Sequence, residues 1–314
     1  MTQVISQYVS DRVSLYNGDS VEILQGLPNN CIHYSIFSPP FSSLYTYSNS
    51  DRDMGNSDSD EQFNTHFKFL IRELARVIMP GRLVSVHCMD IPKMKSRDGV
   101  IGLKDFPGEI IRDFEAAGFI YHSRVLVWKD PLIEATRTKA LGLMHKQLCK
   151  DSAMCRNGLP DYVVTFRKPG DNPEPIPHDD GLKRFYGENE PEGVKTLAPQ
   201  PEPAPIYSHQ VWRRYASPVW MDIRQSNTLN KAAARDEKDE RHICPLQLDL
   251  IARCLELWTN PDDIVLDPFA GIGSVPVVAL QMGRRGLGFE LKESYYKQMV
   301  LNCKEEENHD ENQL

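Results

Sequence analysis

Two short stretches of this chain combine residue types that could carry out chemistry, one near each end of the sequence. In residues 267–274 an apolar run ends in Asp267, and a glycine-containing turn then leads into a second apolar run. A strand, a tight turn and a helix in this order gather backbone N–H groups around one crevice. Residues 286–290 have the composition of the next strand and end in Glu290, whose carboxylate can bind a ribose diol. The pattern predicts a site for a ligand that contains a nucleoside.

The kind of ligand follows from what the turn contains and what it lacks. Gly271 and Gly273 are followed by residues 274–276, Ser-Val-Pro, so the third glycine of the dinucleotide fingerprint G-x-G-x-x-G is missing. Asp267, directly before the turn, would repel a pyrophosphate and attract a cation. S-adenosylmethionine (SAM) is a cationic nucleoside without phosphate, so the turn favours SAM. The alternative is an ordinary βα turn in which Asp267 is a buried cap.

The second stretch is Ser38-Pro39-Pro40-Phe41, which follows an apolar run expected to be a strand. Two prolines fix an extended loop, and its carbonyl groups remain available as hydrogen-bond acceptors. Ser38 adds a hydroxyl acceptor, and Phe41 offers a ring for stacking. This set suits a flat ring that carries an exocyclic amine, as in a flipped-out base. The alternative is a stiff loop with a core phenylalanine.

The apolar periodicity of the chain predicts the elements that must position these two stretches. Strands are expected at residues 13–19, 31–37, 82–88, 121–128, 264–267 and 286–290, with residues 162–166 as an edge strand. Helices are expected at residues 20–24, 63–77, 108–117, 246–258, 275–280 and 292–302. This alternation predicts an α/β fold: a mostly parallel sheet with helices on both faces.

Composition narrows the class of protein. A net charge of −8 provides no global basic field for nucleic acid, although it allows a local basic cleft. The seven cysteines form no C-x-x-C pair, so no metal site is predicted, and free thiols suit a cytoplasmic location. No stretch approaches the roughly 18 apolar residues of a membrane span, so no membrane association is expected.

Basic residues cluster in two segments that could contact nucleic acid. Residues 136–156 suit phosphate contacts, and a solvated helix face would have the same composition. Residues 206–231 interleave aromatic side chains with arginines, which suits contact with bases or a small packed subdomain. The candidate DNA-binding residues are Arg137, Lys139, Lys146, Arg213 and Arg214. Residues 169–205 are rich in proline without apolar periodicity, which predicts an extended linker or insertion.

Together the two stretches resemble a known family. Residues 267–274 resemble the SAM-binding motif of amino-methylating DNA methyltransferases, and residues 38–41 resemble their catalytic tetrapeptide, (Asp/Asn/Ser)-Pro-Pro-(Tyr/Phe/Trp). The tetrapeptide precedes the SAM motif, as in the circularly permuted β class of bacteria and phages. Supporting matches are Gly18-Asp19, Pro80-Gly81, Val127-Trp128-Lys129 and Gly288-Phe289-Glu290.

The resemblance implies a Rossmann-like SAM-dependent methyltransferase fold, circularly permuted, with an inserted target-recognition region. The implied organisation is a catalytic half at 1–168, a linker and target-recognition region at 169–235, a SAM-binding half at 236–304 and an acidic disordered tail at 305–314. The implied partner is double-stranded DNA, bound by a monomer or homodimer, as in restriction-modification systems.

The resemblance also assigns roles to residues. The implied cofactor-binding residues are Asp19, Asp267, Pro268, Phe269, Ala270, Gly271, Gly273, Ser274 and Glu290, and the implied catalytic residues are Ser38, Pro39, Pro40 and Phe41. Asp267 and the turn would surround the methionine part of SAM, Glu290 would bind the ribose, and Asp19 would contact the adenine end. Phe41 would stack on a flipped base, whose amine would donate to Ser38. Such an amine attacks the methyl group in line, so catalysis is mainly positioning and desolvation.

Several alternatives remain open at this point. Ser-Pro-Pro in the family goes mostly with N4-cytosine and Asp-Pro-Pro with N6-adenine, which favours cytosine, although both bases present an amine. Arg241-His242-Ile243-Cys244-Pro245 stands where the family often has His-Pro, so the residues that hold the SAM carboxylate stay unassigned. Other readings are a methyltransferase for RNA or protein glutamine, a DNA-binding protein without turnover, and a nicotinamide oxidoreductase, which the missing glycine disfavours.

Overall fold

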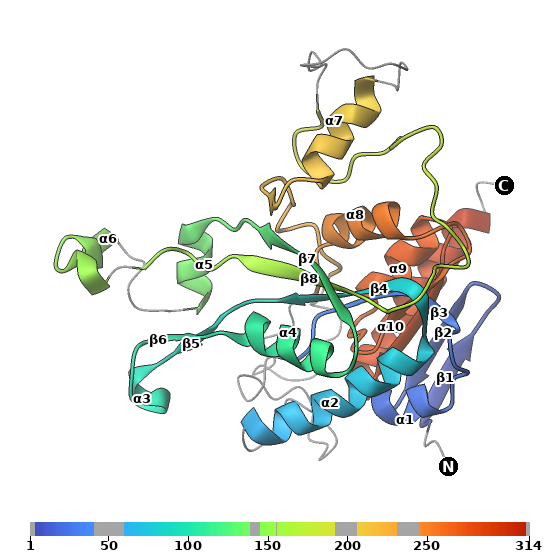
Figure 1. The fold of residues 1–314 in the computed structure, drawn as a ribbon, viewed down its shortest axis with the longest axis horizontal. Helices are drawn as coiled ribbons and strands as arrows, with labels where there is room; N and C mark the ends of the chain where they lie inside the picture. Colours follow the sequence, from blue (N-terminus) through green and yellow to red (C-terminus); the bar gives the residue numbers. More distant parts are fainter. Residues whose placement is uncertain are drawn as a thin grey trace.

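The computed structural model of the protein describes residues 4–40, 60–138, 145–154, 156–191, 206–230 and 245–311. Within these ranges nine strands form one sheet, in the order β1-β2-β11-β10-β3-β4-β8-β7-β9 (Figure 1). The strands are β1 (Ser6–Val9), β2 (Val13–Asn17), β3 (Ile32–Phe37), β4 (Ile78–Cys88), β7 (Ile120–Val127), β8 (Asp161–Arg167), β9 (Val219–Trp220), β10 (Ile264–Asp267) and β11 (Arg285–Glu290). A separate hairpin pairs β5 (Ile91–Lys93) with β6 (Gly102–Lys104).

The five central strands β2, β11, β10, β3 and β4 run parallel to one another. β8 is antiparallel to both β4 and β7, so its first residue lies at the edge of the sheet where the parallel strands end. The prediction of an edge strand at residues 162–166 was therefore wrong. The reason is that both faces of β8 are apolar: Val163 packs into the core on one side of the sheet and Val164 into the core on the other.

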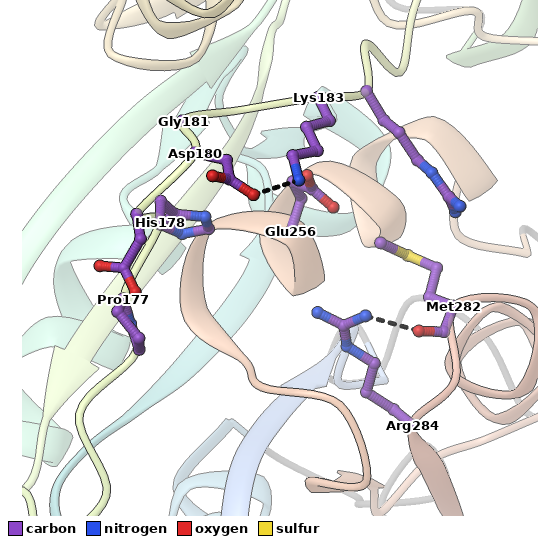
Figure 2. Close-up of a pocket in the computed structure, with 10 residues that line it drawn as sticks. Pro177, His178, Asp180, Gly181, Lys183, Glu256, Met282 and Arg284 are labelled. Carbon is purple, nitrogen blue, oxygen red and sulfur yellow. Dashed lines mark hydrogen bonds and ion pairs between the residues drawn. The ribbon is translucent and has the colours of Figure 1, made fainter. Parts of the chain in front are cut away.

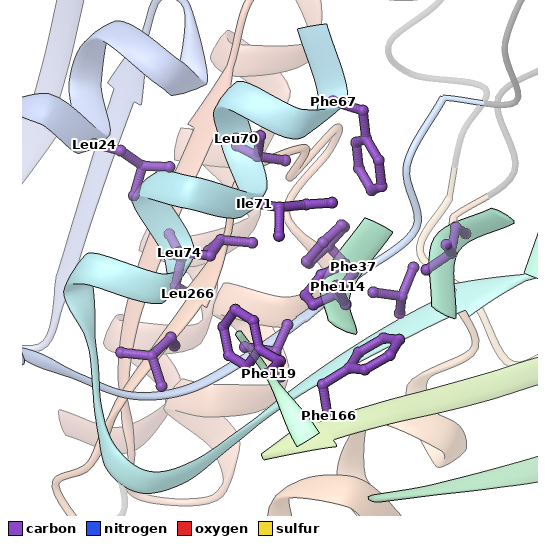
Figure 3. Close-up of a cluster of buried hydrophobic side chains, with 14 of the residues drawn as sticks. Leu24, Phe37, Phe67, Leu70, Ile71, Leu74, Phe114, Phe119, Phe166 and Leu266 are labelled. Atoms are coloured by element: carbon purple, nitrogen blue, oxygen red, sulfur yellow. The ribbon is translucent and has the colours of Figure 1, made fainter. Parts of the chain in front are cut away.

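Helices cover both faces of the sheet, as predicted. One layer consists of α1 (Ser20–Gln25), α2 (Asp60–Val77) and α4 (Phe106–Ala116). Its core holds the apolar stripe of α2, including Phe67, Leu70 and Leu74, against the sheet (Figure 3). Phe114 of α4 stacks on Phe166 of β8, with ring centroids 4.0 Å apart. In α2, Phe67, Leu70 and Leu74 are spaced three and four positions apart, so they lie on the same buried face of the helix.

The other layer consists of α8 (Leu248–Trp258), α9 (Ser274–Gln281) and α10 (Glu293–Glu311). Leu250, Cys254 and Val278 pack with Tyr34 of β3 and Val265 of β10 in its core. The predicted α/β fold with helices on both faces is confirmed. None of the helices in the described ranges combines the length and hydropathy that a membrane crossing needs.

The acidic end of the chain differs from its prediction. Residues 305–311 continue α10 and are not a disordered tail, whereas residues 312–314 lie outside the described residues. Glu307 accepts hydrogen bonds from Tyr8 and Ser10 at the β1–β2 edge, and Gln281 of α9 donates to Glu306. These partners explain why a charged segment stays helical.

Two groups of elements project from the edge at which β4 and β7 end (Figure 1). The β5–β6 hairpin, with α3 (Lys95–Asp98), follows β4, while α5 (Pro131–Thr138), α6 (His145–Leu148) and a short 3-10 helix (Ser152–Met154) follow β7. Residues 156–191 return through β8 and then run extended towards α7 (Ile206–Tyr215), which lies above α8 in the figure.

Candidate active site

The two sequence stretches meet at the boundary between β10 and β3. These strands are parallel neighbours, with Val265 opposite Tyr34 and Leu266 opposite Ser35. The chain leaves β10 towards β11 on one side and leaves β3 towards β4 on the other. Such a change of direction opens a crevice beyond the carboxyl ends of the strands, where open α/β sheets bind their ligands.

The turn after β10 has a backbone that requires glycine. Gly273 caps α9 with a φ of 92°, in the left-handed region that favours glycine. A Cβ atom on Gly273 would lie 2.8 Å from Cγ of Met299 in α10, so the position also lacks room for a side chain. Ser274 begins α9 as its first residue and is buried. The turn thus brings its backbone close to both β11 and α10.

Asp267 ends β10 and is buried, with 5% of its surface exposed. Burial raises the pKa of its carboxyl to about 8, the hydrogen bond from the Phe269 N–H opposes that rise, and the charge of Glu290 adds to it. A buried carboxylate gains most from a cationic partner. Among the described residues no cation is paired with Asp267, so its chemistry fits a positively charged ligand in the crevice.

Glu290 ends β11 on the other side of the turn, and its carboxylate is held in place by the backbone. Oε2 accepts from the Gly271 N–H at 2.9 Å and Oε1 accepts from the Lys292 N–H at 2.8 Å. A carboxylate oxygen can accept more than one hydrogen bond. On the neighbouring strand, Asn17 lies opposite Glu290, which brings Asp19 to the same edge. Asp19 caps α1 by accepting from the Glu22 N–H, so its capping role is shown.

The predicted catalytic tetrapeptide begins directly after β3. Pro39 and Pro40 are buried and Ser38 is half-buried, while Phe41 lies outside the described residues. Phe37, the last residue of β3, contacts Phe269 in the turn after β10, with ring centroids 5.8 Å apart. This contact between the two motifs joins the predicted catalytic loop to the predicted cofactor turn, and it places Ser38 beside the crevice.

Three residues that sequence reasoning did not assign complete this edge. His87 of β4 has Nδ1 3.3 Å from the Ser38 hydroxyl and Nε2 3.2 Å from Oδ2 of Asp161. Lys129, two residues after β7, donates to Oδ1 of Asp161 at 2.6 Å. The only sequence signal for any of them was the match of residues 127–129 to the family pattern.

The predicted DNA-binding residues are divided among separate elements. Lys146 is exposed on α6, Arg213 is exposed on α7, and Arg137 belongs to α5. Arg214 lies 3.5 Å from the buried carboxylate of Asp222, so this arginine pairs within the protein. Lys139 lies outside the described residues, as do residues 241–244 of the unassigned carboxylate-binding stretch. Of the side chains that the structure describes, Lys146 and Arg213 thus lie on different elements, α6 and α7.

A hollow of about 430 Å³ lies elsewhere, between α8, α9 and the extended segment at residues 177–184 (Figure 2). Arg284 precedes β11, so the hollow lies at the opposite end of the strands from Asp267. Its lysine and arginine side chains have partners within the protein: Lys183 pairs with Asp180 at 2.5 Å, Arg284 donates to the Met282 carbonyl, and Arg184 donates to the Tyr186 side chain. We therefore assign no ligand to this hollow.

One group of potential metal ligands occurs in the described part of the chain: His33, Glu174 and Asp263. The buried guanidinium of Arg82 already pairs with it, 2.9 Å from Asp263 and 3.5 Å from Glu174. His33 Nδ1 accepts from the Ile264 N–H at 3.1 Å. The group is an ion-pair network at the start of β3 and β10, in which His33 has a structural role.

The chain belongs to the DNA methylase family: the N6/N4 methyltransferase family model matches residues 32–301. The Type II methyltransferase M.Cfr9I of Citrobacter freundii is 37% identical over 305 residues, which cover 90% of this chain and 84% of that protein. The sequence resemblance to amino-methylating DNA methyltransferases is confirmed. Several other curated Type II methyltransferases match over 56%, 61% or 66% of their own length, so the chain spans less than two thirds of those proteins.

Two solved structures share the fold. TTHA0409 from Thermus thermophilus, a DNA modification methylase complexed with SAM, superposes with a TM-score of 0.63 at 20% identity, covering 95% of this chain and 94% of that one. The cytosine-N4-specific PvuII DNA methyltransferase gives a TM-score of 0.61 at 18% identity, covering 96% and 90%. At these identities the likeness concerns the fold alone, and it confirms the predicted methyltransferase architecture.

Proposed function

We propose that the protein transfers a methyl group from SAM to the exocyclic amine of a flipped-out base in double-stranded DNA, with N4 of cytosine favoured. One observation carries the proposal: Phe37 and Phe269 touch at the β10–β3 boundary and bring the Ser-Pro-Pro loop against the Asp267 turn. A methyl donor site and an amine-binding loop are useful only when they adjoin.

The crevice residues fit SAM. Asp267 presents a buried carboxyl whose raised pKa is relieved by a cation, and a neutral or anionic nucleotide would not provide that relief. Glu290 is held by two backbone N–H groups in a position from which its oxygens can also accept from ribose hydroxyls. Asp19, two residues after the neighbouring strand β2, is proposed to contact the adenine end of SAM. SAM supplies an electrophilic methyl group; the protein supplies its position.

Ser38 gives the loop its preference for an amine. A hydroxyl oxygen accepts a hydrogen bond from an N–H group, and the stiff Pro39-Pro40 backbone fixes where that oxygen lies. The flipped base is expected to stack on Phe41. Serine at this position is the feature that favours N4 of cytosine over N6 of adenine.

The projecting elements are proposed to contact DNA. The β5–β6 hairpin with α3 and the α5–α6 segment leave the same edge of the sheet as Ser38 and Asp267. Lys95 and Lys146 are exposed on these projections, and such lysines contact phosphates in a way that does not depend on base sequence. Target recognition is assigned to residues 169–235, where Trp212 and Arg213 are exposed on α7. The active form is proposed to be a monomer or homodimer.

The test is mass spectrometry of nucleosides after incubation of the purified protein with SAM and genomic DNA, in parallel with RNA and a bulk protein extract. The expected product is N4-methylcytosine in DNA. N6-methyladenine would keep the enzyme class and reverse the choice of base. Methylation restricted to RNA or protein, or none at all, would refute the proposed function.

A further inference from the structure

Four polar side chains form one line along the edge of the sheet that carries the proposed active site. Two of them belong to strands, and the other two lie just after strands. The line runs Ser38 (after β3), His87 (β4), Asp161 (β8) and Lys129 (after β7), with successive distances of 3.3, 3.2 and 2.6 Å. Strand register produces it: Phe37 lies opposite Val86, and Asp161 lies opposite Val127. The antiparallel direction of β8 brings Asp161, its first residue, to this edge.

The inner members of the line are buried. His87 and Asp161 are 8% and 5% exposed, and the Lys129 side chain is 11% exposed. Burial alone would raise the pKa of the Asp161 carboxyl, but His87 and Lys129 hold it well below its usual range. Asp161 is thus a carboxylate that faces the imidazole. His87 Nε2 is buried and lies 3.2 Å from Oδ2 of Asp161, an ion-pair contact that does not have the geometry of a hydrogen bond among the described residues.

The Ser38 hydroxyl has one proton, and the two acceptors near it in the described ranges both belong to His87. These are the backbone carbonyl oxygen and Nδ1, each 3.3 Å from Oγ. Distances of this length in a free protein commonly shorten when substrate binds. Donation to either acceptor leaves the lone pairs of Oγ available for the amine of the base.

We propose that His87 is a positioning residue for the methyl transfer: held as the Nε2–H tautomer by Asp161, it orients the Ser38 hydroxyl and takes up the proton that Ser38 passes on. The assignment rests on the proposed function of the site. It extends that function because the Ser-Pro-Pro loop by itself contains no group that can hold a proton.

The proton balance explains the need for such a group. The amine nitrogen forms a bond to the methyl carbon, the carbon–sulfur bond breaks, and its electron pair stays on sulfur. The methylated nitrogen then carries one proton too many. It releases that proton to Ser38 Oγ while the Ser38 proton moves to His87 Nδ1, and the imidazolium faces the Asp161 carboxylate. The proton leaves to water after the products depart, so no other reactant is required.

A purely structural role for this line would be that it holds β3, β4, β8 and β7 in register. The two roles differ in what they require of His87. A structural bridge needs only a proton on Nε2 that faces Asp161, so it works equally well when the ring is protonated at both nitrogens. A proton acceptor requires Nδ1 to be unprotonated before the reaction.

In the described part of the chain, two charged groups and one hydroxyl face His87. Asp161 comes from β8, Lys129 acts through Asp161 from the end of β7, and the Ser38 hydroxyl follows β3. Cys88, the next residue of β4, turns into the core under α2 and α4. Substitution of Asp161 should therefore remove the one carboxylate that faces the imidazole among the described residues.

The first measurement does not depend on activity. Long-range ¹H–¹⁵N correlation spectra of the histidine-labelled protein, assigned with His87→Asn, report the tautomer of His87. The expected result is a neutral ring protonated at Nε2. A ring protonated at Nδ1, or at both nitrogens at neutral pH, would overturn the proposal, because Nδ1 could then not accept a proton.

The second measurement is the pH dependence of single-turnover methylation of DNA. His87→Asn puts an amide near the position of Nδ1, so it can hold the Ser38 hydroxyl but cannot take its proton. With SAM saturating at every pH, so that the ionisation of Asp267 does not contribute, turnover should fall at least about tenfold and the acid limb of the profile should disappear, while SAM affinity at a fixed pH stays within about twofold of the wild type. Asp161→Asn should move the acid limb to lower pH, because the imidazolium loses its carboxylate partner.

His122→Asn is the matched control, since His122 also bonds a serine, Ser123, at 2.9 Å, but at an exposed position of β7. It should keep wild-type turnover and pH profile. Wild-type turnover and profile in His87→Asn would refute the role of His87 while leaving the methyltransferase function intact. Absence of DNA methylation by the wild type would refute the function itself. Thermal unfolding of each variant checks that it is folded, and if His87→Asn is not, the wild-type tautomer and Asp161→Asn decide.

Discussion

The binding of SAM should be linked to the ionisation of Asp267, and the linkage can be measured. Burial raises the pKa of this carboxyl to about 8, so most molecules of the free protein carry it protonated at neutral pH. A cationic ligand favours the carboxylate. SAM binding should therefore release a proton from Asp267 at neutral pH, and the affinity should rise as the pH rises towards and past 8.

The size of the effect follows from the pKa. A carboxyl with a pKa of about 8 is ionised in about 1% of molecules at pH 6, about 10% at pH 7 and about 90% at pH 9. If only the ionised form binds, the dissociation constant falls about 90-fold from pH 6 to pH 9, or about 2.7 kcal/mol. The α-amino group of SAM titrates in the same range, near pH 8, so wild-type data alone would mix the two ionisations.

The variant Asp267→Asn separates the ionisation of Asp267 from that of the SAM α-amino group. Asparagine is close in shape, can still accept from the Phe269 N–H and does not titrate. The ratio of the two dissociation constants cancels the titration of the ligand, and this ratio should favour the wild type increasingly with pH, by about 90-fold between pH 6 and pH 9. Calorimetry at several pH values gives the affinities, and buffers with different ionisation enthalpies count the protons. If the wild type and Asp267→Asn share one pH dependence, Asp267 does not contact the cation.

Three further changes test other parts of the structure. Ser38→Ala should lower turnover at least about tenfold but leave SAM affinity within about twofold, and turnover equal to the wild type would remove the hydroxyl from the site. Gly273→Ala should lower the free energy of unfolding by more than Gly118→Ala, since both have φ near 90° but only Gly273 lacks room for a Cβ atom; about 1 to 3 kcal/mol of difference is expected in urea titrations, and equal effects would contradict the packing argument. Arg253→Met should cost about 3 kcal/mol of unfolding free energy, because it leaves the carboxylate of Asp222 buried without its closest cation; loss of less than about 1 kcal/mol would show that Asp222 is solvated.

The two motifs could be found from the sequence because each is local. Asp267 and Glu290 each end an apolar run, and the glycines between them follow within one turn. The Ser-Pro-Pro loop likewise follows its own strand. In a parallel sheet all such strand ends share one edge, so the meeting of the motifs follows from the strand pattern once the strands are adjacent.

The aromatic and arginine residues near residue 220 show where local pattern is ambiguous. The prediction left open contact with DNA or a packed subdomain. In the structure Trp220, Tyr215 and Phe185 surround the guanidinium of Arg253, at 4.9, 4.6 and 5.5 Å from their ring centroids. Arg253 belongs to α8 and is fully buried. The partner that fixes these rings thus lies in a helix distant in sequence, which no window around residue 220 contains.

The line of side chains from Ser38 to Lys129 could not be predicted from the sequence, for a related reason. Asp161 is the first residue of its strand, and the start of a strand ordinarily lies at the edge opposite an active site in a parallel sheet. Only the antiparallel direction of β8 reverses this, and β8 also lies between β4 and β7. The sequence of residues 161–167 predicts a strand but not its direction or its neighbours. Strand direction, which depends on the long connections at either end, therefore decides whether His87 faces a carboxylate, and with it whether the proposed amine-binding loop has beside it the residue that we propose receives a proton.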